Sequence, residues 1–467
     1  MDNSYNAVMS RRNQIMKQAI GLDYSQFSLS DLAFDYEKMM NHGEYSIDRI
    51  VEIQKNQGVG NTPLYELKNF TEIARKLAPA GKGARIFVKD EAANPSGSFK
   101  DRRAAVSVYN AKKNGYKGVI AATSGNYGAA VASQAAMQML DCIIIQEAFD
   151  SKGIYQPEIM EKGRACETYG AEVIQLSVGP ELFYVFLKTL EETGYFNASL
   201  YSPFGIAGIE TLGLEIAEQC KEIAGRKPSK VIVTHAGGGN LTGTARGLQK
   251  AGCSDTEVIG ASIDLTGLHM ASDNDFNKKS FTTGHTGFSV PFTTWPDRAD
   301  VPKNAARPLR YLDRFVTVSQ GEAFYVTEML AKLEGMERGP AGNTSLAAAI
   351  KIAQEMEQDE VLVVQETEYT GAGKHINAQL SFAKENGIEI QHGDPAENVP
   401  GENIIFPKDP SLINVKEHSI DKLRNTYLKN IKKNFDINDL RDVDWKFLEQ
   451  ELNCTKSHIK TLLGKES

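Results

Sequence analysis

Cysteine is scarce in this chain, and an excess of positive charge and long apolar runs are both missing. The five cysteines include no CxxC pair, which argues against a disulfide framework and a zinc site. Lysine plus arginine number 52 and aspartate plus glutamate 60, so the net charge is −8, unlike that of a nucleic-acid or anionic-membrane binder. No apolar run approaches the roughly 18 residues of a membrane span, and the first residues have no leader-like apolar core. We therefore expect a cytoplasmic protein that binds neither nucleic acid nor membrane.

The 467 residues are enough for two or three cores, and their composition, 41% hydrophobic and 24% charged, is that of a globular protein. From residue 86 on, apolar runs alternate with alanine-rich helical patterns, as in parallel sheets with crossover helices. The expected strands are 86–90, 118–123, 142–146, 172–176, 230–236, 257–263 and 360–366. The expected helices are 99–114, 128–140, 208–224 and 345–356. The pattern predicts a doubly wound α/β enzyme whose strands are buried on both faces, and the length favours two sheets.

Changes in composition divide the chain. We expect an N-terminal extension over 1–58, a large domain over 59–120 and 201–394, a smaller, mobile substrate domain over 121–200, and a helical C-terminal extension over 395–467. The helical tail from Ile420 to Leu463 carries spaced apolar residues that need a cover, which makes it the expected docking surface for a partner.

Three glycine-rich segments follow expected strands, at the edge where open α/β sheets bind ligands. The first, NPSGSFKDRR at 94–103, places Lys100 in the first turn of a helix, where the helix dipole disfavours a cation. A neutral or imine-linked nitrogen suits that position better than an ammonium group. A solvent-exposed loop lysine is the alternative interpretation.

The other two segments have the features of anion sites. ATSGNYGAA at 122–130 presents Thr123, Ser124 and Gly125 at a helix N-terminus, a place sized for a carboxylate, although a plain strand-to-helix turn is an alternative. THAGGGNLTG at 234–243 has three successive glycines before a helix, which suits a phosphate group. It lacks the Lys-Ser/Thr of a Walker loop and the GxGxxG spacing of a dinucleotide fold.

An imine-forming lysine, a carboxylate loop and a phosphate loop without a nucleotide motif together indicate pyridoxal 5′-phosphate. Over residues 58–374 the chain resembles the fold type II pyridoxal-phosphate enzymes, the group of tryptophan synthase β, cysteine synthase, threonine dehydratase and threonine synthase. The resemblance rests on GNTPL (60–64), SGSFKDR (96–102), SGN (124–126), GGG (237–239) and TGAG (370–373). It implies two doubly wound α/β domains with the cofactor in the cleft between them.

The resemblance also implies roles for individual residues. Lys100 is expected to form the Schiff base and to act as the base at Cα, Asn126 to bond the phenolic oxygen, and Thr370 to face the pyridine nitrogen. The expected phosphate cradle consists of Gly237, Gly238, Gly239, Asn240 and Leu241, and the expected substrate contacts are Thr123, Ser124 and Gly125. Asn240 replaces the family's fourth glycine, which puts the backbone conformation there in question.

Within this group, SGSFKDR fits the threonine synthases, but Arg103 replaces a small residue, and Lys374 and His375 depart from the family's Leu-Lys-Asp. The whole-chain pattern includes SRRNQIMK (10–17), PFTTWPDRAD (291–300) and the helical tail. With these segments the chain most resembles the β subunits of thiolases that cleave 2-amino-4-oxopentanoate with coenzyme A to acetyl-CoA and alanine in ornithine degradation. That similarity implies a small α subunit as partner, with a homodimer of this chain in the complex. The alternatives are threonine synthase acting on O-phosphohomoserine, another lyase of the group, and a scaffold subunit that has lost activity.

Several further side chains have both a functional and a structural interpretation. His235 is either a base near the cofactor or a packing residue, and Cys142 and Cys166 are either acyl carriers or core thiols. His375 is close in sequence to Thr370 and is a candidate for supporting the site. Lys112, Lys113 and Lys117 either contact a nucleotide phosphate or form a solvated helix end.

Overall fold

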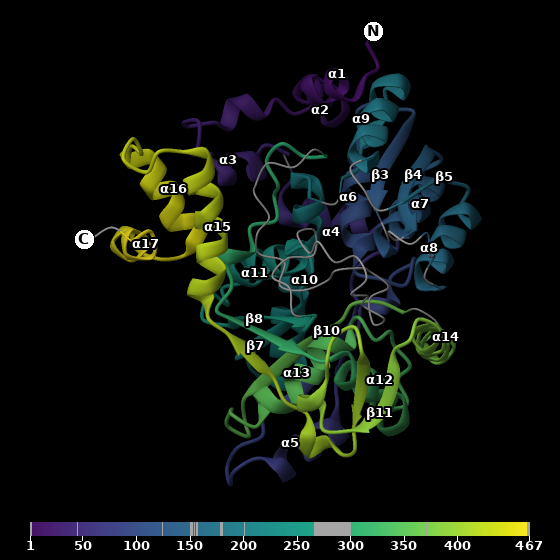
Figure 1. Cartoon of the computed structure of the whole chain (residues 1–467), viewed down its shortest axis with the longest axis vertical. Helices are drawn as coiled ribbons and strands as arrows, with labels where there is room; N and C mark the ends of the chain where they lie inside the picture. Colours follow the sequence, from purple (N-terminus) through teal and green to yellow (C-terminus); the bar gives the residue numbers. More distant parts are fainter. Residues whose placement is uncertain are drawn as a thin grey trace.

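The chain folds around two separate sheets, one in the lower half of the molecule and one at the upper right (Figure 1). The computed structural model describes residues 2–43, 45–123, 125–149, 153, 155, 157–177, 181–199, 201–265, 300–369 and 372–464, with the side chains of 372–375 excluded. None of the helices in this part of the chain is long and apolar enough to cross a membrane.

The larger sheet has seven strands, of which the five central ones run parallel. In spatial order they are β1 (Leu64–Glu66), β2 (Arg85–Asp90), β10 (Val361–Glu366), β7 (Lys230–Thr234), β8 (Glu257–Ile263), β9 (Arg314–Val318) and β13 (Lys416–His418). The short edge strands β1 and β13 are antiparallel to their neighbours. Because β10 and its neighbours are covered on both faces, their apolar runs are continuous, as expected for a parallel sheet.

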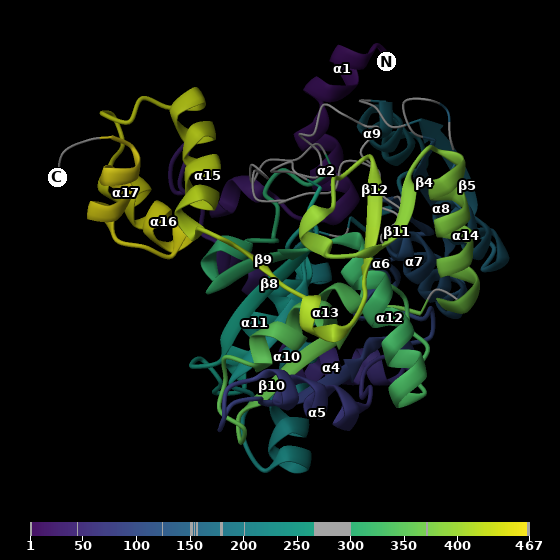
Figure 2. The ribbon, with the colours of Figure 1, turned by 60° about the horizontal axis from the view of Figure 1, so that its bottom comes forward.

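The smaller sheet has four parallel strands. Their order is β5 (Glu172–Ser177), β4 (Asp141–Phe149), β3 (Gly118–Thr123) and β6 (Phe196–Asn197). All seven strands expected from the sequence are present, which confirms the α/β fold with two sheets. The expectation of burial on both faces is wrong for β5, an edge strand with exposed and half-buried residues along its length. A separate pair, β11 (Glu389–Gly393) and β12 (Asn403–Pro407), lies near α14 (Figure 2).

The expected helices are α6 (Lys100–Lys113), α7 (Asn126–Gln138), α10 (Pro203–Gln219) and α13 (Asn343–Ala353). The other main-body helices include α5 (Lys68–Leu77), α8 (Pro157–Thr168), α9 (Glu181–Thr193), α11 (Gly239–Lys250), α12 (Gln320–Glu334) and α14 (Ala372–Glu385). Helices α10 and α11 pack backbone to backbone, because a Cβ atom at Gly247 would lie 1.9 Å from the Glu210 carbonyl oxygen. This close contact fixes the position of α11.

The N-terminal residues form α1 (Tyr5–Ser10), α2 (Arg12–Ile20), α3 (Tyr36–Asn41) and α4 (Ile47–Lys55). Helices α1 and α2 contact α9 beside the smaller sheet. The buried Gln54 side chain on α4 donates to the carbonyl oxygens of Arg102 at 3.0 Å and Gly208 at 2.6 Å. The N-terminal segment thereby braces α6 against α10.

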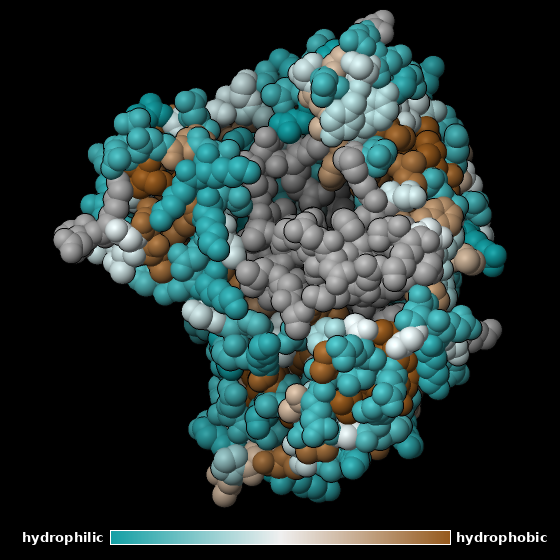
Figure 3. All heavy atoms as spheres, viewed as in Figure 1, coloured by the Kyte–Doolittle hydropathy of each residue, from teal (hydrophilic) through white to brown (hydrophobic). Residues whose placement is uncertain are grey.

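The C-terminal residues form a lobe of α15 (Ile420–Asn434), α16 (Asp442–Leu452) and α17 (Lys456–Leu462), on the opposite side of the molecule from α14 (Figures 1 and 2). Its Glu451 accepts from Arg307 at 2.6 Å and also pairs with Arg310. The expectation that this tail leaves its apolar residues for a partner is wrong, because Trp445, Leu448, Leu452, Ile459 and Leu463 are buried within the chain. On the face shown in Figure 3 most side chains of the lobe are polar, with small apolar areas between them.

Candidate active site

A cavity of about 250 Å³ lies where β3, β7 and β10 end. Both sheets contribute to its wall, through Thr123 at the end of β3, Thr234 at the end of β7 and Thr367 directly after β10. Of the residues selected from the sequence it brings together Lys100, Thr123, Gly125, Asn126, Gly237, Gly238, Gly239, Asn240 and Leu241. Ser124 and Thr370, and the side chains of Lys374 and His375, lie outside the described residues.

Lys100 is the first residue of α6. Its Nζ atom lies 4.7 Å from the centre of the Phe99 ring. Burial, together with the neighbouring Arg103 guanidinium, lowers the pKa of Lys100 to about 8. A substantial fraction of the amine is therefore neutral near physiological pH, as attack on an aldehyde requires.

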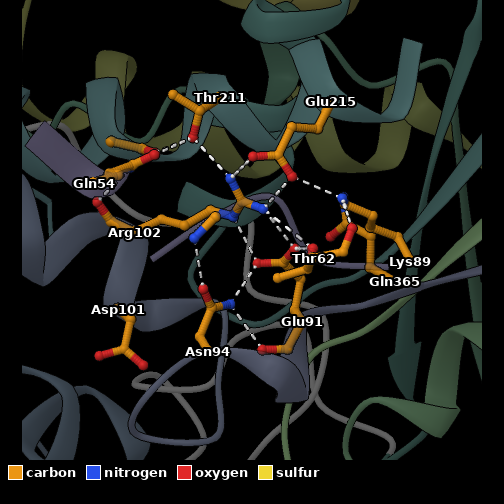
Figure 4. Close-up of polar contacts among 12 residues, drawn as sticks. Gln54, Thr62, Lys89, Glu91, Asn94, Asp101, Arg102, Thr211, Glu215 and Gln365 are labelled. Atoms are coloured by element: carbon orange, nitrogen blue, oxygen red, sulfur yellow. Dashed lines mark hydrogen bonds and ion pairs between the residues drawn. The ribbon is translucent and has the colours of Figure 1, made fainter. Parts of the chain in front are cut away.

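The segment before α6 is held by a buried charge network centred on Arg102 (Figure 4). Arg102 donates to Glu91 at 2.7 Å and to Glu215 at 2.7 Å. Thr62 donates to Glu91 at 2.6 Å, and Lys89 donates to Glu215 at 2.7 Å. The GNTPL and SGSFKDR motifs thus meet in one network, which fixes where α6 begins.

A second set of bonds shapes the loop that carries Lys100. Asn94 accepts from the backbone N–H of Gly60 at 3.0 Å and donates to Glu91. Asp101, in the first turn of α6, accepts from both the N–H and the hydroxyl of Ser96 at 2.7 Å. Burial raises the pKa of Asp101 to about 6, although the Ser96 bonds favour its charged form. These contacts close the loop into one conformation.

Close contacts require the three glycines at the start of α11, Gly237 to Gly239. A Cβ atom at Gly237 would lie 1.4 Å from the Tyr201 hydroxyl oxygen, and one at Gly239 would lie 2.6 Å from Arg103 Nη2. Gly238 has a left-handed backbone with φ of +79°. The loop therefore presents bare backbone, followed by the N-terminus of a helix, to the cavity, which is suitable for an anion.

Asn240 needs no glycine conformation, because it lies within the right-handed helix α11. Its side-chain amide donates to Gln365 Oε1 on β10 at 2.7 Å, and Gln365 donates to Thr244 at 2.9 Å. The side chain is thereby held against the sheet, and the loop backbone remains free to contact a ligand.

The loop after β3 reaches the cavity from the smaller sheet. Thr123 accepts from the N–H of Gly125 at 3.1 Å, and Asn126 begins α7. The Asn126 amide donates to Glu368 Oε2 at 3.4 Å, across the gap between the sheets. One edge of the cavity therefore carries Lys100 and the glycine loop at the start of α11, and the opposite edge carries the side-chain amide of Asn126.

These residues fit a phosphate-bearing aldehyde cofactor. The cradle presents backbone without side chains to the cavity, Lys100 has a lowered pKa, and Asn126 supplies a directional donor. The sequence did not single out Tyr201, Glu147, Glu158, Asp300 or Glu368, which also line the cavity, and it noted Arg103, another lining residue, only as the replacement of a small residue. Burial lowers the pKa of Arg103 to about 10.

The remaining candidates lie elsewhere. His235 is buried, and its ring packs edge-on against Phe315 with centroids 5.7 Å apart; burial lowers its pKa to about 3. Burial raises the pKa of Cys142 and that of Cys166, the latter to about 12, as for core thiols. Lys112 donates to the carbonyl of Gln138. None of these side chains is among the described residues that line the cavity.

Comparison with known proteins supports this interpretation. The family of pyridoxal-phosphate dependent enzymes matches residues 55–367. The chain is 63% identical over 462 residues to a 2-amino-4-ketopentanoate thiolase beta subunit from Acetoanaerobium sticklandii, covering 99% of this chain and 98% of that one. It is 27% identical to a threonine synthase from a Bacillus species, over 62% of this chain and 77% of the other. The crystal structure of a T.th. threonine deaminase is similar, with TM-score 0.52 and 25% identity over 69% of this chain and 98% of that one.

Proposed function

Because the chain belongs to the pyridoxal-phosphate dependent enzymes, we propose that it is the β subunit of a thiolase. The reaction is cleavage of 2-amino-4-oxopentanoate, also called 2-amino-4-ketopentanoate, with coenzyme A to give acetyl-CoA and alanine. The observation that carries this proposal is the similarity to a thiolase beta subunit over the whole chain, both extensions included. The family as a whole shares only the central part.

Pyridoxal 5′-phosphate, when bound, stabilises negative charge that develops on an amino-acid substrate. Lys100 is the residue that would bind its aldehyde carbon, and afterwards takes and returns the proton at Cα. Gly237 to Leu241 would hold the phosphate, and Asn126 would donate to the phenolic oxygen. The sequence motif assigns to Thr370 the hydroxyl that would face the pyridine nitrogen.

The substrate contacts follow from the loop after β3. Thr123, Ser124 and Gly125 bind the amino-acid carboxylate at the start of α7. We propose that residues 121–200 move as a substrate domain against a large domain of 59–120 and 201–394, with the extensions 1–58 and 395–467 outside both. Movement of the smaller domain would exclude water from the cavity.

The thiolase name of the relative includes "beta subunit", so we propose that a small α subunit completes the enzyme and that this chain forms a homodimer within the complex. Coenzyme A and a small amino acid are the other ligands. In this proposal the reaction is a step of ornithine degradation and takes place in the cytoplasm.

The test is an assay of the purified chain with and without its small partner. We expect thioester formation from 2-amino-4-oxopentanoate and coenzyme A by the complex, and no phosphate from O-phosphohomoserine. Phosphate release by the isolated chain without thioester formation would assign it to threonine synthase. A protein that neither binds the cofactor nor catalyses either reaction would be a scaffold subunit.

A further inference from the structure

Glu158 and Glu368 lie in the wall of the cavity that contains Lys100. Glu158 is on α8, beside the smaller sheet, and Glu368 follows β10 of the larger sheet. Their exposed fractions are only 5% and 1%. Two carboxyl groups, from opposite sides of the cleft, thus line the same cavity as the reactive lysine.

The surroundings of Glu158 suit a group that gains and loses a proton. Burial raises the pKa of Glu158 to about 8, and the nearby charge of Glu368 adds to the rise. Lys162, one turn further along α8, and Lys100 act in the opposite direction. These surroundings move the titration of the Glu158 carboxyl group from the ordinary acidic range toward neutral pH. Glu368, in contrast, accepts the Asn126 amide and is held in place by it.

The proposed thiolysis requires one proton transfer that Lys100 does not perform. The bond between the thiol sulfur and C4 forms, and the bond between C3 and C4 breaks. The thiol loses its proton, and C3 gains one to become the methyl group of alanine. A single side chain that takes the first proton and delivers it to C3 balances the reaction.

We propose that Glu158 is this catalytic residue, with its carboxylate accepting the thiol proton and its carboxylic acid protonating C3. The inference rests on the proposed function. A thiol with an ordinary pKa near 8.5 is matched to such a base, since general acid–base catalysis is most efficient when the two groups have similar pKa values and titrate near the working pH.

Hydrogen exchange of alanine in D₂O, followed by mass spectrometry, tests the assignment with the cofactor-loaded complex of both subunits. The wild type is expected to exchange both the α-hydrogen, through Lys100, and the β-hydrogens, through Glu158. Glu158→Gln should keep α-exchange and slow β-exchange by about a hundredfold or more. Glu167→Gln, on the exposed side of the same helix, is the matched control and should keep both.

The two possible failures are distinguishable. Exchange of β-hydrogens by Glu158→Gln at the wild-type rate would overturn the role of Glu158 and leave the thiolase proposal intact. A wild-type complex that forms no thioester and exchanges no β-hydrogen would overturn the proposed function, and this inference with it.

An infrared measurement on the cofactor-free protein gives a readout independent of activity. The wild type minus Glu158→Gln difference spectrum should contain the C=O band of a protonated carboxyl group at about pH 6, lost as the pH rises through about 8. A difference spectrum with no such band would contradict the proposal.

Discussion

Arg102 and Glu91 form an ion pair in which neither side chain is exposed, with the guanidinium Nε donating to Glu91 Oε2 at 2.7 Å. Glu215 accepts from the same guanidinium. The pKa of Glu215 shows whether burial or the neighbouring cations have the larger effect. Burial would raise the pKa of Glu215, but Arg102 and Lys89 outweigh burial and lower it to about 2. The network holds the start of α6, and therefore Lys100, in place.

Arg102→Ala should destabilise the protein by about 3–5 kcal/mol, because Glu91 would remain buried without its cation and Glu215 would keep only Lys89. The free energy of unfolding in urea measures this. Arg226→Ala is the control, since Arg226 and Asp359 pair on the surface and the loss of this pair should cost below about 1 kcal/mol. Equal losses of unfolding free energy in the two variants would show that the buried network stabilises the protein no more than a surface ion pair does.

The charge of Lys100 should destabilise the cofactor-free protein in a pH-dependent way. Its folded pKa of about 8 is below the ordinary value, so the native state binds fewer protons than the unfolded state between about pH 8 and pH 10.4. The destabilisation is complete below about pH 8 and disappears as the pH rises to about 10.4. Lys100→Met should therefore raise the urea midpoint most at about pH 7 and little at about pH 10.4. A difference that is constant with pH would refute the lowered pKa.

Gly237→Ala should reduce cofactor binding by at least about tenfold, equivalent to about 1.4 kcal/mol, because the new Cβ would lie 1.4 Å from the Tyr201 hydroxyl oxygen and displace the loop. Equilibrium titration of the cofactor-free protein with pyridoxal phosphate, followed by absorbance, gives the affinity. Gly393→Ala is the matched control, because its Cβ would have only an ordinary contact of 3.4 Å with Ile405. Unchanged affinity in Gly237→Ala would place the phosphate elsewhere.

Most of the parallel strands, although not β9 or β6, and the three glycine-rich loops were predictable because their signals are local. A strand such as β8 (257–263), covered on both faces, is apolar throughout, and the glycines at 237–239 mark a sharp strand-to-helix turn. The edge strands β1, β6 and β13 were not predicted, because a segment of two or three residues is too short to show the alternation of apolar and polar residues that marks a strand.

The acidic part of the site was not predictable from the sequence, because it depends on packing between distant segments. Glu158 is on a helix of the smaller sheet, and Glu368 is 210 positions later in the chain; only the fold brings them to one cavity. Asn240 was uncertain for the same reason, since its bond to Gln365 joins α11 to a strand far away in the sequence. The burial of Trp445 likewise depends on how the C-terminal helices pack.

The most direct test of the thiolase account is the fate of the carbon atoms of the substrate. The complex of both subunits is supplied with coenzyme A and 2-amino-4-oxopentanoate labelled with ¹³C at C4 and C5, and the products are analysed by mass spectrometry. The account predicts doubly labelled acetyl-CoA and unlabelled alanine, in a reaction that Lys100→Ala abolishes. Label that stays in the amino acid, with no labelled thioester formed, would contradict it.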